Sequence, residues 1–356
     1  MTLKLIAIGA LGTMLGPSAE HLNPDIAQYL RVLDRGKSGE QRDKRRAAWR
    51  EHGAELVSSL EQLLGEGDFD GLVICAGKNG DDFAIFKQLL PLLQNLQPSV
   101  KPYFILHMST VSCDFVRATF AYCQRYQVQY ANYPLTGGAA GAQNAQMLIL
   151  ASGDQSLYQR VEPMLQCIGV PQYFGEDVAQ GAAVKLIGHV MVFHGLLGIS
   201  LAAVLHKNVL GLSDLSKEQV PFFDFLNKGA GGTRQWDVAL RQSLLEEQWQ
   251  RGFLIHYAVI DALYTVNLML EKNLPRRLIL PLLEVILLFC LVLQKDEKQG
   301  FATQSIAHLL AQEPSPAIDA FLTQRLSWDV EASLKNCIAA LPAQLRKILM
   351  LEVSYD

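Results

Sequence analysis

The sequence predicts an α/β chain, with a Rossmann-type amino-terminal domain built on a doubly wound, mostly parallel sheet and an all-α carboxyl-terminal domain. Short strand-like runs alternate with helical segments through the first half, which is the pattern of parallel βαβ units. Beyond about Gly175 nearly every segment has helical spacing. A chain of 356 residues is long enough for two domains. We expect them at residues 1–177 and 178–356, the second beginning with a long interdomain helix near Val178 to Asn208.

The first half is interpreted from its apolar periodicity and its glycines. Apolar and β-branched runs that end in glycine, serine, threonine or a charge predict strands at residues 3–9, 29–35, 54–57, 71–77, 103–110, 128–135 and 146–153. The segments between them predict helices at about residues 14–28, 42–50, 58–64, 81–96 and 113–126. Ligands on such a sheet bind outside the carboxyl ends of the strands, and the small residues lie at those ends.

Composition excludes several classes of function. The net charge is −4, so no global basic excess indicates a nucleic-acid partner. One basic cluster, Arg42 to Arg50, is interpreted as a solvated helix face in preference to a phosphate contact. The six cysteines are scattered without metal-ligand spacing, which predicts no metal site and a reducing, cytoplasmic location.

The longest apolar run, residues 278–293, is interrupted by Pro281 and Glu284 and is short for a membrane span. We therefore expect a buried core or interface helix and no membrane partner. The helical half carries more apolar surface than a lone domain needs, which predicts a homodimer formed through the all-α domain.

The turn after the first strand is a degraded dinucleotide-binding fingerprint. The motif G-x-G-x-x-G provides a tight turn and close backbone approach to a pyrophosphate. Here the segment is IGALGTMLG, residues 8–16, and only the central Gly12 remains when the motif is anchored there. With one extra residue, Gly9, Gly12 and Gly16 could share the role, although an ordinary βα turn explains the segment equally well. The candidate cofactor contacts are Gly9, Ala10, Leu11, Gly12, Thr13 and Met14.

The end of the second strand bears on the choice between NAD and NADP. Asp34 lies 22 residues beyond Gly12, and an acid there can accept hydrogen bonds from ribose hydroxyls, which favours NAD. Arg35, with Lys37 and Ser38, can instead hold a 2′-phosphate. A charged strand end in solvent is the alternative, so the cofactor is NAD or NADP without a choice between them. At later strand ends, Ala76, Gly77, Lys78 and Thr110 are further candidate cofactor contacts.

The segment NYPLTGGAAGAQNAQ, residues 132–146, is rich in glycine and alanine. It is either a flexible linker or a loop whose backbone N–H groups approach a small anion. Strand-like segments flank it directly, which favours the loop.

In this order, the segments resemble the β-hydroxyacid dehydrogenases, the family of 3-hydroxyisobutyrate and 6-phosphogluconate dehydrogenases. The resemblance covers about residues 3–310, and the glycine-rich segment is its most specific part. The stretches that carry it are LGTM, LDR, HMSTVSCDFVR, NYPLTGGAAGAQNAQMLILASGD, GAAVKLIGH and FLIHYAVIDALYTVNLML.

The resemblance implies roles for particular residues. Thr136, Gly137 and Gly138 would hold the carboxylate of a small substrate, and Lys185 would be the catalytic acid/base. Lys185 is a lone lysine in a long apolar helix, where burial lowers a lysine pKa toward the useful range; a lysine that extends to the surface is the alternative. His189 lies one turn later on the same face, and Asp261 lies on the later helix that lines the cleft in the family.

Three departures from the family are visible. His189 replaces an asparagine, Ile260 replaces a lysine before Asp261, and Leu15 replaces the third glycine of the turn. In addition, His256 stands at a position where an arginine is common in the family. Residues beyond about Pro314 exceed the usual family length, and their helical pattern suggests subunit contact.

The sequence therefore predicts an NAD(P)-dependent oxidoreductase that transfers hydride between the nicotinamide and a small β-hydroxy acid or related carbonyl compound. One alternative is an imine reductase on the same scaffold, against which Lys185 argues. The other is a non-catalytic dimeric relative that binds a nucleotide or a partner, which the departures favour.

Overall fold

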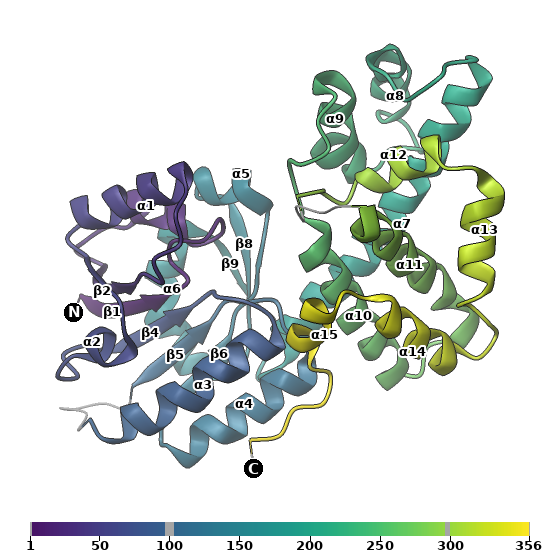
Figure 1. The fold of residues 1–356 in the computed structure, drawn as a ribbon. Helices are drawn as coiled ribbons and strands as arrows, with labels where there is room; N and C mark the ends of the chain where they lie inside the picture. Colours follow the sequence, from purple (N-terminus) through teal and green to yellow (C-terminus); the bar gives the residue numbers. More distant parts are fainter. Residues whose placement is uncertain (1, 97–102, 296–299, 356) are drawn as a thin grey trace. The chain divides into compact units, whose positions relative to one another are not determined.

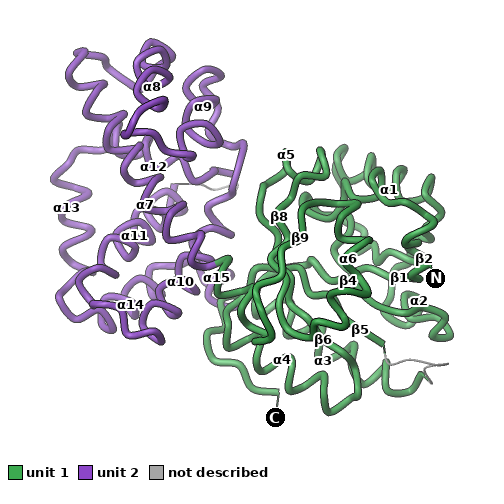
Figure 2. Tube along the Cα trace, turned by 180° about the vertical axis from the view of Figure 1, so that it is seen from behind, with its two compact units in different colours: residues 1–185, 348–356 green, residues 186–347 purple. Residues whose placement is uncertain are grey.

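The computed structural model describes residues 2–96, 103–295 and 300–355. The chain divides into two compact units (Figure 2). The amino-terminal unit comprises residues 1–185 together with residues 348–356, and the helical unit comprises residues 186–347. The sequence predicts a boundary at 177/178, whereas the units divide inside one continuous helix and the last nine residues belong to the first unit.

A six-stranded parallel sheet forms the centre of the amino-terminal unit. Its order is β3-β2-β1-β4-β5-β6, and every pair is parallel. This is the doubly wound order of dinucleotide-binding folds, with its switch point between β1 and β4. The predicted Rossmann-type fold is confirmed. The strands are β1 Leu3–Ile8, β2 Ala27–Leu33, β3 Glu55–Val57, β4 Gly71–Ile74, β5 Phe104–His107 and β6 Gln129–Asn132.

Helices follow the strands in alternation (Figure 1). They are α1 Glu40–Glu51, α2 Leu60–Leu64, α3 Asn79–Gln94, α4 Cys113–Arg125 and α6 Gln155–Ile168. Side-chain caps fix several starts: Ser112 accepts from the Phe115 N–H at α4, and Asp154 accepts from the Ser156 and Leu157 N–H groups at α6. All four residues of β4 and of β5 are buried, as expected for central strands covered on both faces.

The predicted helix at residues 14–28 is wrong. Only a 3-10 helix, η1 Gly16–His21, forms there, and β2 begins at Ala27. Leu15 is fully buried in the core of the unit, and the backbone then turns at Asn23 to enter β2. The apolar residues of this segment therefore fill the core from a short connection instead of forming one face of a long helix.

The glycine-rich segment joins two strands of a second, three-stranded sheet. Its strands are β7 Leu135–Thr136, β8 Met147–Ala151 and β9 Gly169–Tyr173, and β7 pairs with β8 in antiparallel fashion. The short helix α5, Gly138–Gln143, lies between β7 and β8. The segment is thus an ordered connection between paired strands, which excludes the linker interpretation.

The helical unit contains only helices and connections among its described residues, apart from one isolated β-bridge. The long helix α7, Gln180–Val209, enters it from the amino-terminal unit. The all-α prediction for this half is confirmed. The other helices are η2 Lys217–Gln219, α8 Val220–Leu226, the π-helix η3 Trp236–Leu240, α9 Arg241–Glu246, α10 Ile255–Glu271, η4 Arg276–Leu278, α11 Leu280–Lys295, α12 Ser305–Gln312, α13 Ser315–Thr323, α14 Val330–Ala340 and α15 Ala343–Leu349.

Two helical stretches of the described chain are long and apolar enough to cross a membrane by length and composition, residues 180–209 and 276–295. The second contains α11, whose most apolar window is 61% buried inside the chain. It packs against α10 and α14. The predicted burial of the apolar run at residues 278–293 is therefore confirmed.

Candidate functional site

The turn after β1 is tight although its glycines lack the consensus spacing. Gly9 has a φ of +84°, and a Cβ there would lie 2.1 Å from the carbonyl oxygen of Cys75 at the end of β4. The Gly12 N–H donates to the Gly9 carbonyl at 2.9 Å, and a Cβ on Gly12 would also lie 2.9 Å from that oxygen. Both positions require glycine because backbone approaches them closely. The Gly16 N–H in turn donates to the Gly12 carbonyl.

Two side chains of α1 also donate hydrogen bonds to the backbone of this turn. The Ala10 carbonyl accepts from Trp49 Nε1 at 2.7 Å, and the Leu11 carbonyl accepts from Arg45 Nη1 at 3.1 Å. Thr13 is exposed and Met14 half-buried. The turn leads into the short η1 instead of an α-helix, so it lacks the helix dipole that such folds direct at a pyrophosphate.

Asp34 lies just beyond β2 and is engaged by Arg46 of α1. Arg46 donates from Nε to Oδ2 at 2.7 Å and from Nη2 to Oδ1 at 2.9 Å. The hydrogen bonds from Arg46 hold the pKa of Asp34 below its usual value. Arg35, Lys37 and Ser38 nearby are exposed.

The interpretation of residues 42–50 as a solvated face is therefore incomplete, because two of its arginines bind the predicted cofactor segments. Arg45 bonds the turn after β1, and Arg46 bonds the end of β2. Sequence reasoning missed both residues. The available signal was an acid at a strand end followed, 12 positions later, by a basic helix that must return along the sheet.

The ends of β4 and β5 are joined directly. The Ala76 N–H donates to Ser109 Oγ at 3.1 Å. A Cβ on Gly77 would lie 2.4 Å from the side chain of Asp81 in the first turn of α3, so a larger residue would not fit at position 77. The predicted contacts Ala76, Gly77 and Lys78 thus follow β4, and Thr110 follows β5. Together with the turn after β1, they lie at the carboxyl ends of three neighbouring strands.

The predicted substrate segment presents exposed backbone. Thr136 ends β7, where its partner in β8 is Leu148. Gly137 and Gly138 follow with φ values of +130° and +65°, conformations that L side chains rarely adopt. Both glycines are exposed, so their peptide groups face solvent and are accessible to a small anion.

The first turn of α7 packs closely against strands β6 and β8 of the amino-terminal unit. A Cβ on Gly181 would lie 2.3 Å from the Leu150 carbonyl of β8 and 3.1 Å from the Asn132 carbonyl of β6. The Gly181 N–H donates to Ser152 Oγ at 2.8 Å. Lys185 follows one helical turn later and is half-buried. The close packing of Gly181 therefore determines the position of Lys185. The sequence interpretation did not assign this role to Gly181.

In the helical unit, the structure brings His189 and Asp261 together. His189 Nδ1 of α7 lies 3.9 Å from Asp261 Oδ2 of α10, and both side chains are buried. The His189 ring also lies beside the rings of Phe193 and Phe253. Ile260, which precedes Asp261, is fully buried.

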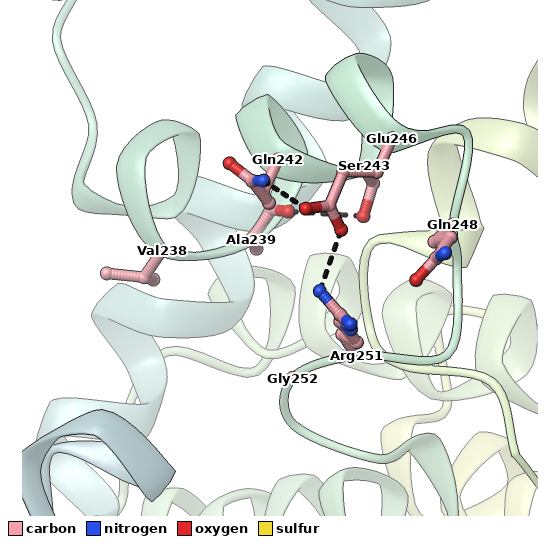
Figure 3. Close-up of a pocket in the computed structure, with 8 residues that line it drawn as sticks. All are labelled: Val238, Ala239, Gln242, Ser243, Glu246, Gln248, Arg251 and Gly252. Carbon is pink, nitrogen blue, oxygen red and sulfur yellow. Dashed lines mark hydrogen bonds and ion pairs between the residues drawn. The ribbon is translucent and has the colours of Figure 1, made fainter. Parts of the chain in front are cut away.

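The helical unit also has a small open cavity of about 160 Å³ (Figure 3). Glu246 accepts from Gln242 and Arg251, so the polar groups there bind one another. None of the predicted site residues lines it. Its lining residues are Val238, Ala239, Gln242, Ser243, Glu246, Gln248, Arg251 and Gly252. Within the described ranges, no group of three or more His, Cys, Asp or Glu residues is arranged to hold a metal ion.

Comparison with known proteins finds sequence relatives for the amino-terminal unit and for longer parts of the chain. Residues 8–181 match the NAD binding domain of 6-phosphogluconate dehydrogenase. The chain is 22% identical over 171 residues to 2-(hydroxymethyl)glutarate dehydrogenase of Eubacterium barkeri, covering 48% of this chain and 55% of that protein. It is 24% identical over 271 residues to an uncharacterized oxidoreductase of Synechocystis, covering 73% of this chain and 84% of that protein. The match thus spans only about half the length of the first of these relatives.

Solved structures share the fold. A 3-hydroxyisobutyrate dehydrogenase of Salmonella typhimurium matches with a TM-score of 0.69 at 17% identity, covering 86% of this chain and 99% of that one. An imine reductase variant of Myxococcus stipitatus, in complex with NAD+, matches with a TM-score of 0.52 at 16% identity, covering 87% and 100%. The matched domain and the named relatives support the sequence resemblance to the β-hydroxyacid dehydrogenase family, and the solved structures show the same fold.

Proposed function

We propose that this protein is an NAD(P)-dependent oxidoreductase that transfers hydride between a nicotinamide and a small β-hydroxy acid or related carbonyl compound. One observation carries the proposal. Gly181 packs against the ends of β6 and β8, so α7 begins beside the strands that flank the glycine-rich segment. Lys185, the sole ionisable residue in the first two turns of α7, follows one turn later. Acid–base chemistry and carboxylate binding are then supplied by neighbouring segments of one unit.

Each residue has a defined task in this proposal. The bound nicotinamide supplies or accepts the hydride. Lys185 Nζ donates a proton to the substrate oxygen during reduction and accepts it during oxidation. Thr136 and the peptide groups of Gly137 and Gly138 bind the substrate carboxylate. Within the helical unit Asp261 lies 3.9 Å from His189, and the proposal that this pair serves the substrate rests on the family resemblance.

The cofactor would be held by the three strand ends described above. After β1, Gly9 and Gly12 are half-buried and Thr13 is exposed, and basic side chains surround the end of β2. This arrangement fits an anionic dinucleotide, although the 3-10 helix after the turn offers it no helix dipole. Either NAD or NADP satisfies the fold.

We further propose a homodimer formed through the helical unit, in a reducing cytoplasmic setting. Ile187, Met191, Leu201, Leu205 and Val209 are exposed, and at 100° per residue they lie within about 80° of one another around α7. Such an apolar stripe on a soluble protein indicates a partner surface. None of the six cysteines forms a disulfide within the described residues, which supports a reducing compartment.

Two alternatives remain distinct in what they require. An imine reductase would act on the same scaffold, and Lys185 argues against it because the resemblance ties imine reduction to loss of that lysine. A non-catalytic relative would bind a nucleotide or partner without turnover. The observation that favours it is the altered turn, in which Leu15 is buried and no α-helix follows.

Titration with NADH and NADPH, followed by nicotinamide fluorescence, tests the proposal first. We expect micromolar binding of at least one cofactor, and turnover with a panel of hydroxy acids and keto acids. Lys185→Ala should lose at least about 100-fold in turnover, the usual contribution of a positioned acid or base, while its cofactor affinity stays within twofold. Binding without turnover by the unaltered protein would favour the non-catalytic relative. Absence of binding at millimolar cofactor would overturn the proposal.

A further inference from the structure

Three segments that are distant in sequence meet at the buried amide of Asn79. Its Oδ1 accepts from the Ser112 N–H at 3.0 Å, and its Nδ2 donates to Ser112 Oγ at 2.8 Å. The same Nδ2 donates to the carbonyl oxygen of Met350 at 2.9 Å. Asn79 and Ser112 are both buried, so these hydrogen bonds are shielded from water and their loss leaves polar groups unsatisfied. One side chain thus links the starts of α3 and α4 to the carboxyl terminus.

The two helix starts follow the predicted cofactor contacts directly. Asn79 is the first residue of α3 and comes next after Ala76, Gly77 and Lys78. Ser112 caps α4 two residues after Thr110, and the Ala76 N–H bonds Ser109 Oγ. Displacement of Asn79 would therefore change the position of both cofactor segments.

The carboxyl terminus is anchored independently at the other end of the tail. The tail is defined as residues 348–355, which belong to the amino-terminal unit. Tyr355 stacks on Tyr122 of α4 with ring centroids 4.2 Å apart and an interplanar angle of 11°. Its hydroxyl lies 2.9 Å from Thr119 Oγ1, and its ring lies 4.6 Å from that of Phe83 in α3. Tyr355 is 8% exposed, so the end of the tail is bound between α3 and α4.

The path from the helical unit into the tail is sharply bent. α15 ends at Leu349, and Met350 has a φ of +36°, a left-handed conformation that costs energy for a residue other than glycine. This bend directs the Met350 carbonyl to Asn79. Such a conformation persists where surrounding contacts hold it, and the Asn79 hydrogen bond and the ring contacts of Tyr355 are two of the contacts made by this segment.

We propose that the tail is a strap that orders both cofactor segments through Asn79, which acts as a positioning residue. The inference rests on the proposed cofactor binding. It adds that the tail modulates the affinity for the cofactor. Because the strap and the cofactor stabilise the same arrangement of residues 76–79 and 109–112, each strengthens the binding of the other. Coupling between two sites is reciprocal in free energy, so this relationship is measurable from both sides.

The first arm measures cofactor affinity in full-length variants. Tyr355→Ala removes the anchor without altering any predicted cofactor contact, and we expect the Kd for the preferred cofactor to rise about fivefold or more. Tyr355→Phe keeps the ring on Tyr122 and loses only the hydroxyl contact with Thr119, so it should restore most of the affinity. Leu148→Ala, an exposed residue of the same unit, is the control and should leave the Kd unchanged.

The second arm measures release of the tail from the unaltered protein. Limited proteolysis of the tail, followed by mass spectrometry, should slow about fivefold or more at saturating cofactor. Cleavage follows the population of the released tail when the tail opens and closes faster than it is cut, and reciprocal coupling lowers that population by the same factor. This arm also decides the matter if Tyr355→Ala does not fold. Equal digestion with and without bound cofactor would overturn the strap. So would an unchanged Kd in a folded Tyr355→Ala protein whose tail is digested faster. Failure of the unaltered protein to bind either cofactor would instead overturn the proposed function on which the strap depends.

Discussion

The guanidinium of Arg46 binds both carboxylate oxygens of Asp34 across the gap between α1 and the end of β2. The two bonds measure 2.7 and 2.9 Å, and both side chains are largely buried, with 14% and 19% exposure. Arg46 also donates to the Lys37 carbonyl at 2.7 Å. The acid that would bind ribose hydroxyls is therefore already paired, and its charge is neutralised. The exposed Arg35 and Lys37 beside it leave this strand end positive overall.

We therefore expect tighter binding of NADPH than of NADH. Arg46→Ala should reverse the order, because the freed Asp34 carboxylate would repel a 2′-phosphate and accept hydrogen bonds from a ribose. The expected loss of NADPH affinity is about 10-fold or more, the scale of one hydrogen bond to a charged group. Fluorescence titration with both cofactors measures the ratio.

The matched control is Arg50→Ala, which removes the same charge from an exposed position four residues later on α1. It should weaken both cofactors equally and only slightly, through long-range electrostatics. An Arg46→Ala protein that keeps the original preference would show that Asp34 does not face the adenosine end of the cofactor.

The glycine turn makes a prediction about stability. Gly9→Ala forces a side chain into a backbone with a φ of +84° and to within 2.1 Å of the Cys75 carbonyl. Strain and overpacking together should lower the free energy of unfolding by roughly 2–5 kcal/mol. Gly36→Ala has a similar φ of +71° but no atom within 4 Å of its Cβ. It should cost only about 1–2 kcal/mol. Urea denaturation compares the two, and equal losses would mean that β1 and β4 separate easily.

The strand order was predictable because buried parallel strands show as short apolar runs with small residues at their ends. The long helix containing Lys185 was predictable for the same reason, since its apolar spacing is continuous. The segment after Gly12 was not, because Leu15 satisfies a helical pattern while its side chain is needed in the core. Local periodicity cannot distinguish these two demands on one apolar residue.

The contacts that define the candidate site depend on residues far apart in sequence. Arg46 and Asp34 are 12 positions apart, and Asn79 and Met350 are 271 apart. No periodicity encodes such pairs, so the carboxyl-terminal tail had no predicted place in the amino-terminal unit. Gly181 was hidden for a different reason. A glycine inside a helix looks like a weak helix former, and its value lies in the close approach of the Leu150 carbonyl.

A pH-dependent stability should arise at His308 in α12. Its ring stacks on Trp249 with centroids 4.8 Å apart, and burial lowers its pKa below the usual 6.5, while Asp214 partly opposes the shift. A histidine whose folded pKa is depressed stabilises the fold above its unfolded pKa, and that stability is lost as the pH falls through and below about 6.5. Thermal unfolding should therefore show a drop in Tm between pH 7.5 and pH 5.5 that is smaller in His308→Gln.

The control for this prediction is His52→Gln, which makes the same change at an exposed histidine after α1. It should leave the pH dependence of the unaltered protein in place. An identical pH dependence in His308→Gln and the unaltered protein would assign the acid sensitivity to other groups.

The apolar stripe on α7 predicts how the protein assembles. Leu205 is 65% exposed and lies at the centre of the stripe, with Ile187 at the same angle around the helix and Met191 and Val209 beside it. Lys185 and His189 lie on the opposite side of α7, at about 160° and 200° from Ile187 at 100° per residue. A partner that covers the stripe would therefore leave the face with the proposed catalytic lysine open.

Leu205→Glu places a charge in the proposed dimer interface, where an unpaired buried charge is strongly unfavourable. Light scattering coupled to gel filtration should show a dimer for the unaltered protein and a monomer for Leu205→Glu. Leu148→Glu makes the same change at a half-exposed leucine of the amino-terminal unit and should remain dimeric. A monomeric unaltered protein would exclude the assembly, and a dimer that survives Leu205→Glu would move its interface away from this face of α7.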